Sequence, residues 1–176
     1  MLLTVTRMHK LIYFENVRVV LATSRFCVFV PETPHVDRID GGHICISAIR
    51  GGAYCLQDLT DEELFELSVL QKLVGKSMID ALKNNGIDVR LVNYQINGNW
   101  TFGEANRPLL HLHLYGRAYT GKRQIFGQSL YFPSKKENPE FYADNQALTE
   151  DEIGKIRRDV LKEIDTRYND LIDVVE

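Results

Sequence analysis

The stretch Pro108-Leu109-Leu110-His111-Leu112-His113-Leu114-Tyr115-Gly116-Arg117 places a leucine at every second position from Leu110 to Leu114. Period-two alternation is typical of a β-strand, in which successive side chains point to opposite faces of the sheet. The leucine face is expected to pack on the core. The opposite face carries His111 and His113 side by side, between Leu109 and Tyr115. The two imidazoles are therefore predicted to face a cleft or solvent, where a polar ligand can reach them.

Two neighbouring imidazoles on one strand face are compatible with three roles. They can satisfy hydrogen bonds within the protein, as a histidine on a strand often does. They can bind zinc, but the sequence positions no nearby acid or cysteine as the third protein ligand that a catalytic zinc site needs, so we expect no metal. They can also attack a substrate, because a neutral imidazole is nucleophilic at one nitrogen when a backbone carbonyl accepts the proton of the other.

The residues upstream of this strand predict the rest of a sheet. Residues 17–31 are rich in Val, Phe and Leu around Thr23 and Ser24, which favours two strands joined by a tight turn. Residues 32–42 hold two prolines and end in Gly-Gly, so they are expected to form a loop, after which His43 opens a strand over 43–47. Residues 89–96 also have strand character, and a polar loop over 97–108 leads to the histidine strand.

Two helices are predicted from their capping boxes. Thr60 and Glu63 form the first box, and apolar residues then recur at three- and four-residue steps until Gly86 supplies a left-handed stop. Thr149 and Glu152 form the second box, which begins an amphipathic terminal helix that packs either on its own core or on a partner subunit. The segment between Arg117 and this helix is largely polar and is expected to be exposed.

The composition indicates an ordinary globular protein. Of the 176 residues, 44% are hydrophobic and 26% charged, which supports a core without disulfides and a single domain over 1–176. The net charge of -3 argues against nucleic acid binding by bulk charge. The three cysteines are far apart and are interpreted as buried thiols. No apolar stretch is long enough to cross a bilayer, so we expect no membrane partner and a cytoplasmic location.

The histidine strand resembles the second half of the histidine triad signature, in which histidines alternate with apolar residues before a glycine- or proline-arginine corner. Gly42-His43-Ile44-Cys45-Ile46 is similar to the Gly-His strand of that family, and residues 56–64 look like the acidic start of its long helix. The resemblance covers residues 25 to 118 and its parts occur in the family's order. It implies an α+β fold with an antiparallel sheet of about five strands, one long helix after the Gly-His strand, and an added C-terminal helix.

The family signature has three histidines, whereas this chain offers two. Aligning the Gly116-Arg117 corner with the corner of the family makes His111 the match to the nucleophile and His113 the match to the third histidine. Leu109 then replaces the first histidine and removes a polar group beside the nucleophile.

Further site residues are implied by the resemblance alone. An asparagine that contacts a phosphate or leaving-group oxygen corresponds to Asn99, with Asn97 as the alternative, and Asn106 matches a polar phosphate-contact position. His43 matches the Gly-His residue that lines the pocket. Glu32 matches an acid or amide that binds ribose hydroxyls, although the loop that follows it is longer here. As solvated loop and strand-end residues, all five also have a plain structural interpretation.

The resemblance implies a nucleotide-binding hydrolase or nucleotidyl transferase that cleaves at an α-phosphate through a nucleotidyl-histidine intermediate. The substrate classes are nucleoside phosphoramidates, nucleotide conjugates and dinucleoside polyphosphates, with no cofactor and with a homodimer as the family habit. The alternative is a catalytically silent nucleotide-binding or interaction module with the same fold. The family-like core spans about residues 11–118, and residues 119–176 form a C-terminal extension whose purpose the resemblance does not explain.

Overall fold

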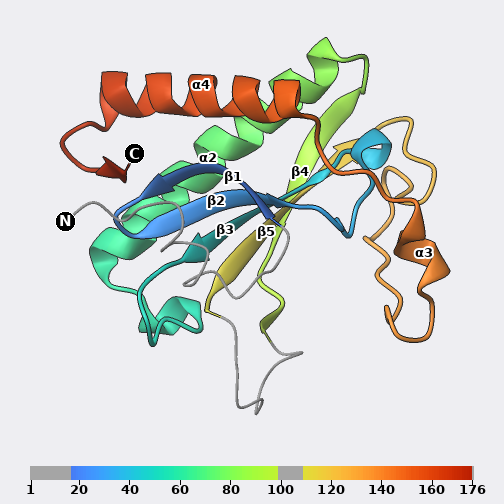
Figure 1. Cartoon of the computed structure of the whole chain (residues 1–176), viewed down its shortest axis with the longest axis horizontal. Coiled ribbons are helices and arrows are strands. Elements are labelled where there is room, and N and C mark those ends of the chain that lie inside the picture. Colours follow the sequence, from blue (N-terminus) through green and yellow to red (C-terminus); the bar gives the residue numbers. More distant parts are fainter. Residues whose placement is uncertain (1–16, 99–108, 176) are drawn as a thin grey trace.

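The computed structural model describes residues 17–98 and 109–175. An antiparallel sheet of six strands forms its centre, in the spatial order β4-β5-β3-β2-β1-β6 (Figure 1). Its strands are β1 (Val17–Thr23), β2 (Phe26–Pro31), β3 (His43–Ala48), β4 (Val89–Gln95), β5 (His111–Ala118) and β6 (Val174–Val175). The first five strands are those predicted from the sequence, so the α+β class and the antiparallel sheet are confirmed. The short β6 was not predicted; it returns the C-terminal segment to β1 by pairing with Ala22 and Thr23.

Two long helices cover one face of the sheet, as Figure 1 shows for α2 (Asp61–Asn84) and α4 (Glu150–Arg167). Both begin at the predicted capping boxes, in which Thr60 pairs with Glu63 and Thr149 with Glu152. Gly86 has a φ of 79° after the end of α2, a conformation that glycine adopts without strain. The remaining elements are short: η1 (Arg38–Asp40), η2 (Leu56–Asp58) and α3 (Glu140–Ala143).

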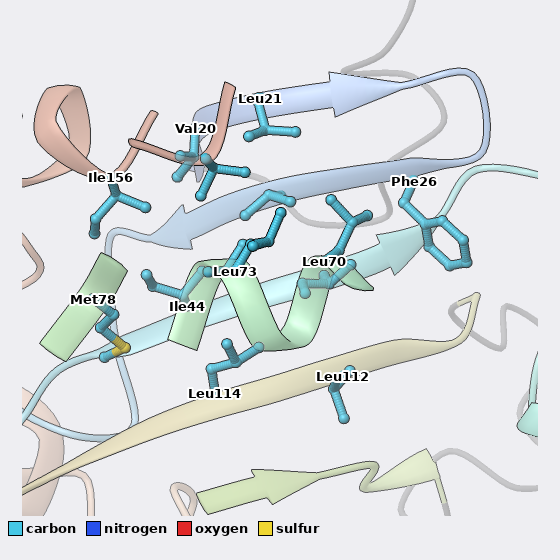
Figure 2. Packing of buried hydrophobic residues seen from close by; sticks show 14 of the residues in the cluster. Val20, Leu21, Phe26, Ile44, Leu70, Leu73, Met78, Leu112, Leu114 and Ile156 are labelled. Atoms are coloured by element: carbon cyan, nitrogen blue, oxygen red, sulfur yellow. The ribbon is translucent and has the colours of Figure 1, made fainter. Parts of the chain in front are cut away.

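The main core lies between the two long helices and the sheet. Leu112 and Leu114 of β5 and Ile44 of β3 belong to one buried cluster with Leu70 and Leu73 of α2, and Figure 2 shows Ile44 and Leu114 beside that helix. The leucine face of the histidine strand is therefore the core face, as the alternation predicts. The terminal helix α4 packs on the same core through Ile153, Ile156, Val160 and Ile164. Of the two alternatives that the sequence left open for this helix, the structure shows packing on its own chain.

The glycine of the predicted Gly-Arg corner lies where two backbone segments nearly touch. A Cβ atom on Gly116 would lie 2.0 Å from the carbonyl oxygen of Gly41, and one on Gly41 would lie 2.3 Å from the carbonyl of Gly116. Gly41 also has a φ of 129°, which disfavours other residues. The corner thus needs glycine so that β5 can pass close to the turn that precedes β3.

We expect Gly116→Ala to lower the free energy of unfolding by about 2–3 kcal/mol, because the added methyl group meets backbone atoms that cannot rotate away. Urea unfolding followed by circular dichroism would measure the loss. Gly51→Ala is the matched control, since a Cβ atom there meets nothing within 4 Å. Equal stabilities of the two variants would contradict the close-approach explanation.

The segment after β5 is held to η1 and to β5 by two buried charged groups, Asp40 and Arg117. The carboxylate of Asp40 accepts backbone N–H groups from Lys122, Arg123 and Gln124 at 2.6, 2.9 and 3.0 Å. Arg117 donates to the carbonyl oxygens of Ile125 and Gln128 at 2.7 and 2.8 Å. Arg117 therefore binds the next part of the chain.

None of the helices that the structure describes combines the length and the apolar character needed to span a membrane.

Candidate active site

Strands β3 and β5 place polar side chains together on the face that α2 and α4 do not cover. In their register His43 lies opposite Tyr115, Cys45 opposite His113 and Ser47 opposite His111. Side chains at directly paired positions of neighbouring strands point to the same face. The rings of His111 and His113 lie nearly perpendicular, with centroids 4.7 Å apart. The structure thus brings both predicted catalytic histidines together beside His43.

His111 has the hydrogen bond that prepares an imidazole for nucleophilic attack. Its Nδ1 lies 2.9 Å from the carbonyl oxygen of Leu109, and since a carbonyl only accepts, Nδ1 carries the hydrogen. In the neutral ring Nε2 then holds the lone pair. Burial lowers the pKa of His111, although the same carbonyl opposes the shift by stabilising the charged ring. The ring is therefore predominantly neutral at pH 7, with Nε2 as its basic nitrogen.

Leu109 contributes its main chain rather than its side chain. The side chain is buried and cannot hydrogen-bond, whereas the carbonyl accepts from His111. A leucine at this position therefore leaves the hydrogen-bond acceptor of His111 in place, because that acceptor belongs to the backbone.

A compact group of hydrogen-bonding side chains lies behind His111. His43 Nε2 is 2.9 Å from His113 Nδ1, and the thiol sulfur of Cys45 is 3.2 Å and 3.3 Å from those two nitrogens. His43 and His113 are only 2% and 4% exposed. Cys45 is buried as the sequence suggested, and so is Cys27, but Cys55 is partly exposed. The expectation that all three cysteines are buried is therefore wrong for Cys55, whose sulfur lies beside the Asp58 carboxylate.

His35 joins this group from the loop after β2 and was missed by the sequence analysis. Its ring stacks on that of His43 with centroids 5.0 Å apart, and its Nδ1 lies 2.9 Å from the Tyr115 hydroxyl. Its backbone N–H donates to His43 Nδ1 at 3.2 Å. Phe132, from the C-terminal extension, packs against both His35 and Tyr115. A histidine in a proline-containing loop has no periodic signal, so only the folded chain reveals this contact.

Burial keeps these imidazoles neutral. Desolvation lowers the pKa of His113 to about 2 and that of His35 to about 4, with smaller contributions from Lys135 and from neighbouring histidines. Desolvation and the same neighbours hold the pKa of His43 well below its ordinary value. Burial also raises the pKa of the Cys45 thiol, so it stays protonated. At pH 7 the group consists of neutral rings and a neutral thiol.

Among the described residues, three of these histidines form the group that most resembles a metal site. One nitrogen from each of His35, His43 and His113 lies within 4.8 Å of the other two. Zinc in proteins is held by neutral imidazole nitrogens and by thiolates. A metal between His43 and His113 would require a lone pair on His43 Nε2. Since His43 Nδ1 accepts the backbone N–H of His35, a neutral His43 carries its hydrogen on Nε2 and lacks that lone pair.

The structure describes three of the five predicted substrate-binding residues. Asn99 and Asn106 lie outside the described residues. Asn97, the alternative to Asn99, follows β4 and lies beside the Tyr115 hydroxyl, and its amide nitrogen is buried without a hydrogen-bond partner among the described residues. Glu32 is exposed just beyond β2. His43 is buried with both ring nitrogens in hydrogen bonds to protein groups, so the substrate contact predicted for it stays a prediction.

Comparison with solved structures identifies the fold. A hypothetical histidine triad nucleotide-binding protein from Sulfolobus tokodaii superposes with a TM-score of 0.53 at 16% identity, over 89% of this chain and 91% of that protein. A histidine triad protein from Bradyrhizobium japonicum gives a TM-score of 0.52 at 16% identity, over 88% and 95%. This chain has the histidine triad fold. A uridylyltransferase shares this fold at a TM-score of 0.50 and 19% identity, with 88% of this chain covering 45% of that protein. No protein-family profile and no curated protein sequence matches the chain.

Proposed function

We propose that this protein is a histidine triad hydrolase or nucleotidyl transferase in which His111 attacks the α-phosphorus of a nucleotide-type substrate. The observation that supports this most directly is the hydrogen bond from His111 Nδ1 to the Leu109 carbonyl, because it leaves the lone pair on Nε2. The fold it shares with a protein named a uridylyltransferase is consistent with nucleotidyl transfer. The substrate classes are nucleoside phosphoramidates, nucleotide conjugates and dinucleoside polyphosphates.

The proposed reaction has two displacements. In the first, the Nε2 lone pair of His111 forms a bond to the α-phosphorus while the bond from phosphorus to the leaving amine or phosphate breaks, and the leaving group takes a proton from solvent. In the second, water or another acceptor attacks the same phosphorus and releases a proton to solvent, the P–Nε2 bond breaks with its electron pair remaining on Nε2, and the neutral imidazole is restored. Dividing the reaction in this way replaces one difficult displacement by two easier ones.

Neighbouring groups supply hydrogen bonds in this proposal. His113 donates to a phosphoryl oxygen or to the leaving group, and the buried amide nitrogen of Asn97, beside the Tyr115 hydroxyl, is a further donor to the substrate. Asn99, Asn106, Glu32 and His43 stay proposed substrate-binding residues on the strength of the resemblance. No cofactor takes part in the proposed chemistry, and a cytoplasmic location remains our expectation.

The second candidate is a nucleotide-binding module with little or no turnover, and the buried Leu109 in place of the first histidine favours it. Incubation with adenylyl phosphoramidate separates the two functions. Release of AMP, together with acid-labile radioactivity on the protein from a phosphate-labelled substrate, would support the enzyme. Binding of the nucleotide without AMP release would support the silent module.

We further propose that the protein is a homodimer that associates through the β4 edge of the sheet. Within the described chain β4 pairs with β5 on one side only, and an unpaired strand edge is a surface on which another chain can dock. Leu91 and Tyr94 are exposed on β4. They also line a groove of about 530 Å³ between β4 and α2.

We expect Leu91→Asp to convert a dimer to a monomer, because a carboxylate buried in such an interface loses its hydration without a partner. Analytical ultracentrifugation over a range of concentrations measures the change. Leu171→Asp is the matched control, since Leu171 is exposed to a similar degree, 53% against 56%, outside this surface. A monomeric wild-type protein, or a Leu91→Asp variant that stays dimeric, would contradict the proposed interface.

A further inference from the structure

The hydrogen bond that His43 accepts from the backbone determines which of its nitrogens carries the hydrogen. A neutral imidazole has its hydrogen on Nδ1 or on Nε2, and its partners decide between them. The backbone N–H of His35 points at His43 Nδ1 from 3.2 Å. Because a backbone amide nitrogen can only donate, Nδ1 must be the acceptor. The hydrogen of His43 is therefore on Nε2.

The position of the hydrogen on His43 determines in turn which nitrogen of His113 carries a hydrogen. His43 Nε2 carries a hydrogen and lies 2.9 Å from His113 Nδ1, so it donates to that nitrogen. The protonated Cys45 thiol lies 3.3 Å from the same nitrogen and 3.2 Å from His43 Nε2, so it can donate weakly to His113 Nδ1 or accept weakly from His43 Nε2, and neither contact requires a hydrogen on His113 Nδ1. His113 Nδ1 is thus an acceptor, and the hydrogen of His113 is on Nε2. None of the described residues accepts a hydrogen bond from that nitrogen.

We propose that His43 is a positioning residue that holds His113 in the tautomer with the hydrogen on Nε2, so that this N–H group is a fixed neutral donor beside His111. In the proposed function, on which this inference rests, the donor binds a phosphoryl oxygen or the leaving group. A pre-oriented donor stabilises negative charge that develops in the transition state without having to reorganise. The hydrogen bond from the backbone amide of His35 to His43 Nδ1 fixes the tautomer of His43 and, through it, that of His113.

The surroundings favour hydrogen bonding by His113 over proton transfer. Among the described residues, the titratable groups that face His43 and His113 are His35, His111, Cys45, Tyr115 and Lys135. None of these is a carboxylate, the Cys45 thiol and the Tyr115 hydroxyl are kept neutral by burial, and Lys135 opposes a second positive charge. The pKa of His113 is lowered to about 2, mainly by burial. A ring with so low a pKa stays a neutral imidazole near neutral pH, which favours hydrogen bonding through its Nε2–H group.

Nitrogen-15 NMR of the histidine rings in the substrate-free protein tests the tautomers directly. We expect His113 and His43 each to show a hydrogen-bearing Nε2 and a bare Nδ1, with shifts that do not titrate between about pH 5 and 8. A hydrogen on Nδ1 of His113, or titration of either ring in this range, would overturn the inference. A shift of both rings on addition of zinc would also overturn it, because a metal needs the opposite tautomer of His43. This measurement requires no turnover, so it stands even if the proposed activity fails.

Kinetics of two His43 variants test the consequence for catalysis. His43→Leu removes the donor, and we expect kcat to fall about 10- to 100-fold with little change in KM, as for other residues that orient a catalytic group. His43→Gln can keep an N–H near the position of Nε2 and should recover part of kcat. Cys27→Ala, a change at another buried position on the sheet, controls for packing loss. A His43→Leu variant with normal kcat, or a His43→Gln variant no better than His43→Leu, would contradict the positioning role.

Discussion

His111→Ala is expected to lower kcat/KM for adenylyl phosphoramidate by about a thousand-fold or more, since removal of a covalent nucleophile commonly costs this much. The residual rate would then reflect only the hydrogen bonds that the neighbouring side chains still offer. His111 is the first residue of β5, and its side chain is partly exposed. Its truncation should therefore leave the core intact, so that the loss of activity does not arise from unfolding. AMP release measured by chromatography, with circular dichroism as a check on folding, provides the test.

Two controls make this result specific to His111. Lys162→Ala alters an exposed residue of α4, on the helical side of the sheet, and should leave AMP release unchanged. Labelled protein trapped from the wild type should be absent from His111→Ala. AMP release by His111→Ala at the wild-type rate would refute the assignment of the nucleophile.

The pH profile should follow the ionisation of the same ring. The pKa of His111 is lowered, mainly by burial, and only the neutral ring has a lone pair on Nε2. Activity should therefore persist below pH 6.5, the ordinary pKa of a histidine, and fall at lower pH as the ring becomes charged. A profile in which the rate is already lost above pH 6.5 would indicate a different essential group.

Glu152→Ala is expected to cost about 3–5 kcal/mol of unfolding free energy, because it leaves a cation and other donors without their buried partner. Glu152 is 0% exposed. Its carboxylate binds the Arg38 guanidinium at 2.7 to 3.0 Å and also accepts from Asn85 and from the Thr149 backbone. These contacts join η1, the end of α2 and the start of α4. Urea unfolding would measure the loss.

Glu150→Ala is the matched control for this substitution. Glu150 forms a comparably short ion pair with Arg18, 2.7 Å, but its side chain is 76% exposed, and such surface pairs contribute about 0–1 kcal/mol. If both variants lost the same stability, burial of the Glu152 network would not be what makes it important.

The contribution of Glu152 should also depend on pH. Burial by itself would raise the pKa of Glu152, but the hydrogen bonds from Arg38, Thr149 and Asn85 outweigh it, and the pKa is lowered. A group whose pKa is lower in the folded state stabilises the fold above its unfolded pKa, near 4.5. That stability is lost as the pH falls through the lower folded value. The difference in stability between wild type and Glu152→Ala should therefore shrink in acid.

The elements of the fold could be predicted because each has a local cause. Alternation over Leu110 to Leu114 determines which face of β5 packs on the core, and the threonine-glutamate boxes determine where α2 and α4 begin. The sequence also made His111 and His113 neighbours, since residues two apart on a strand share a face. The sixth strand escaped prediction because two residues carry no periodicity and form a strand only by pairing with β1.

The tautomers of the clustered histidine rings, by contrast, depend on tertiary structure. The sequence determined that two imidazoles lie together on a strand and that a backbone carbonyl is available to one of them. The strand pairing brought His43 and Cys45 against His113, and the loop after β2 brought the His35 amide to His43. A hydrogen's position on an imidazole depends on which donors lie within about 3 Å, and contacts between residues 8 and 70 positions apart arise only when the chain has folded.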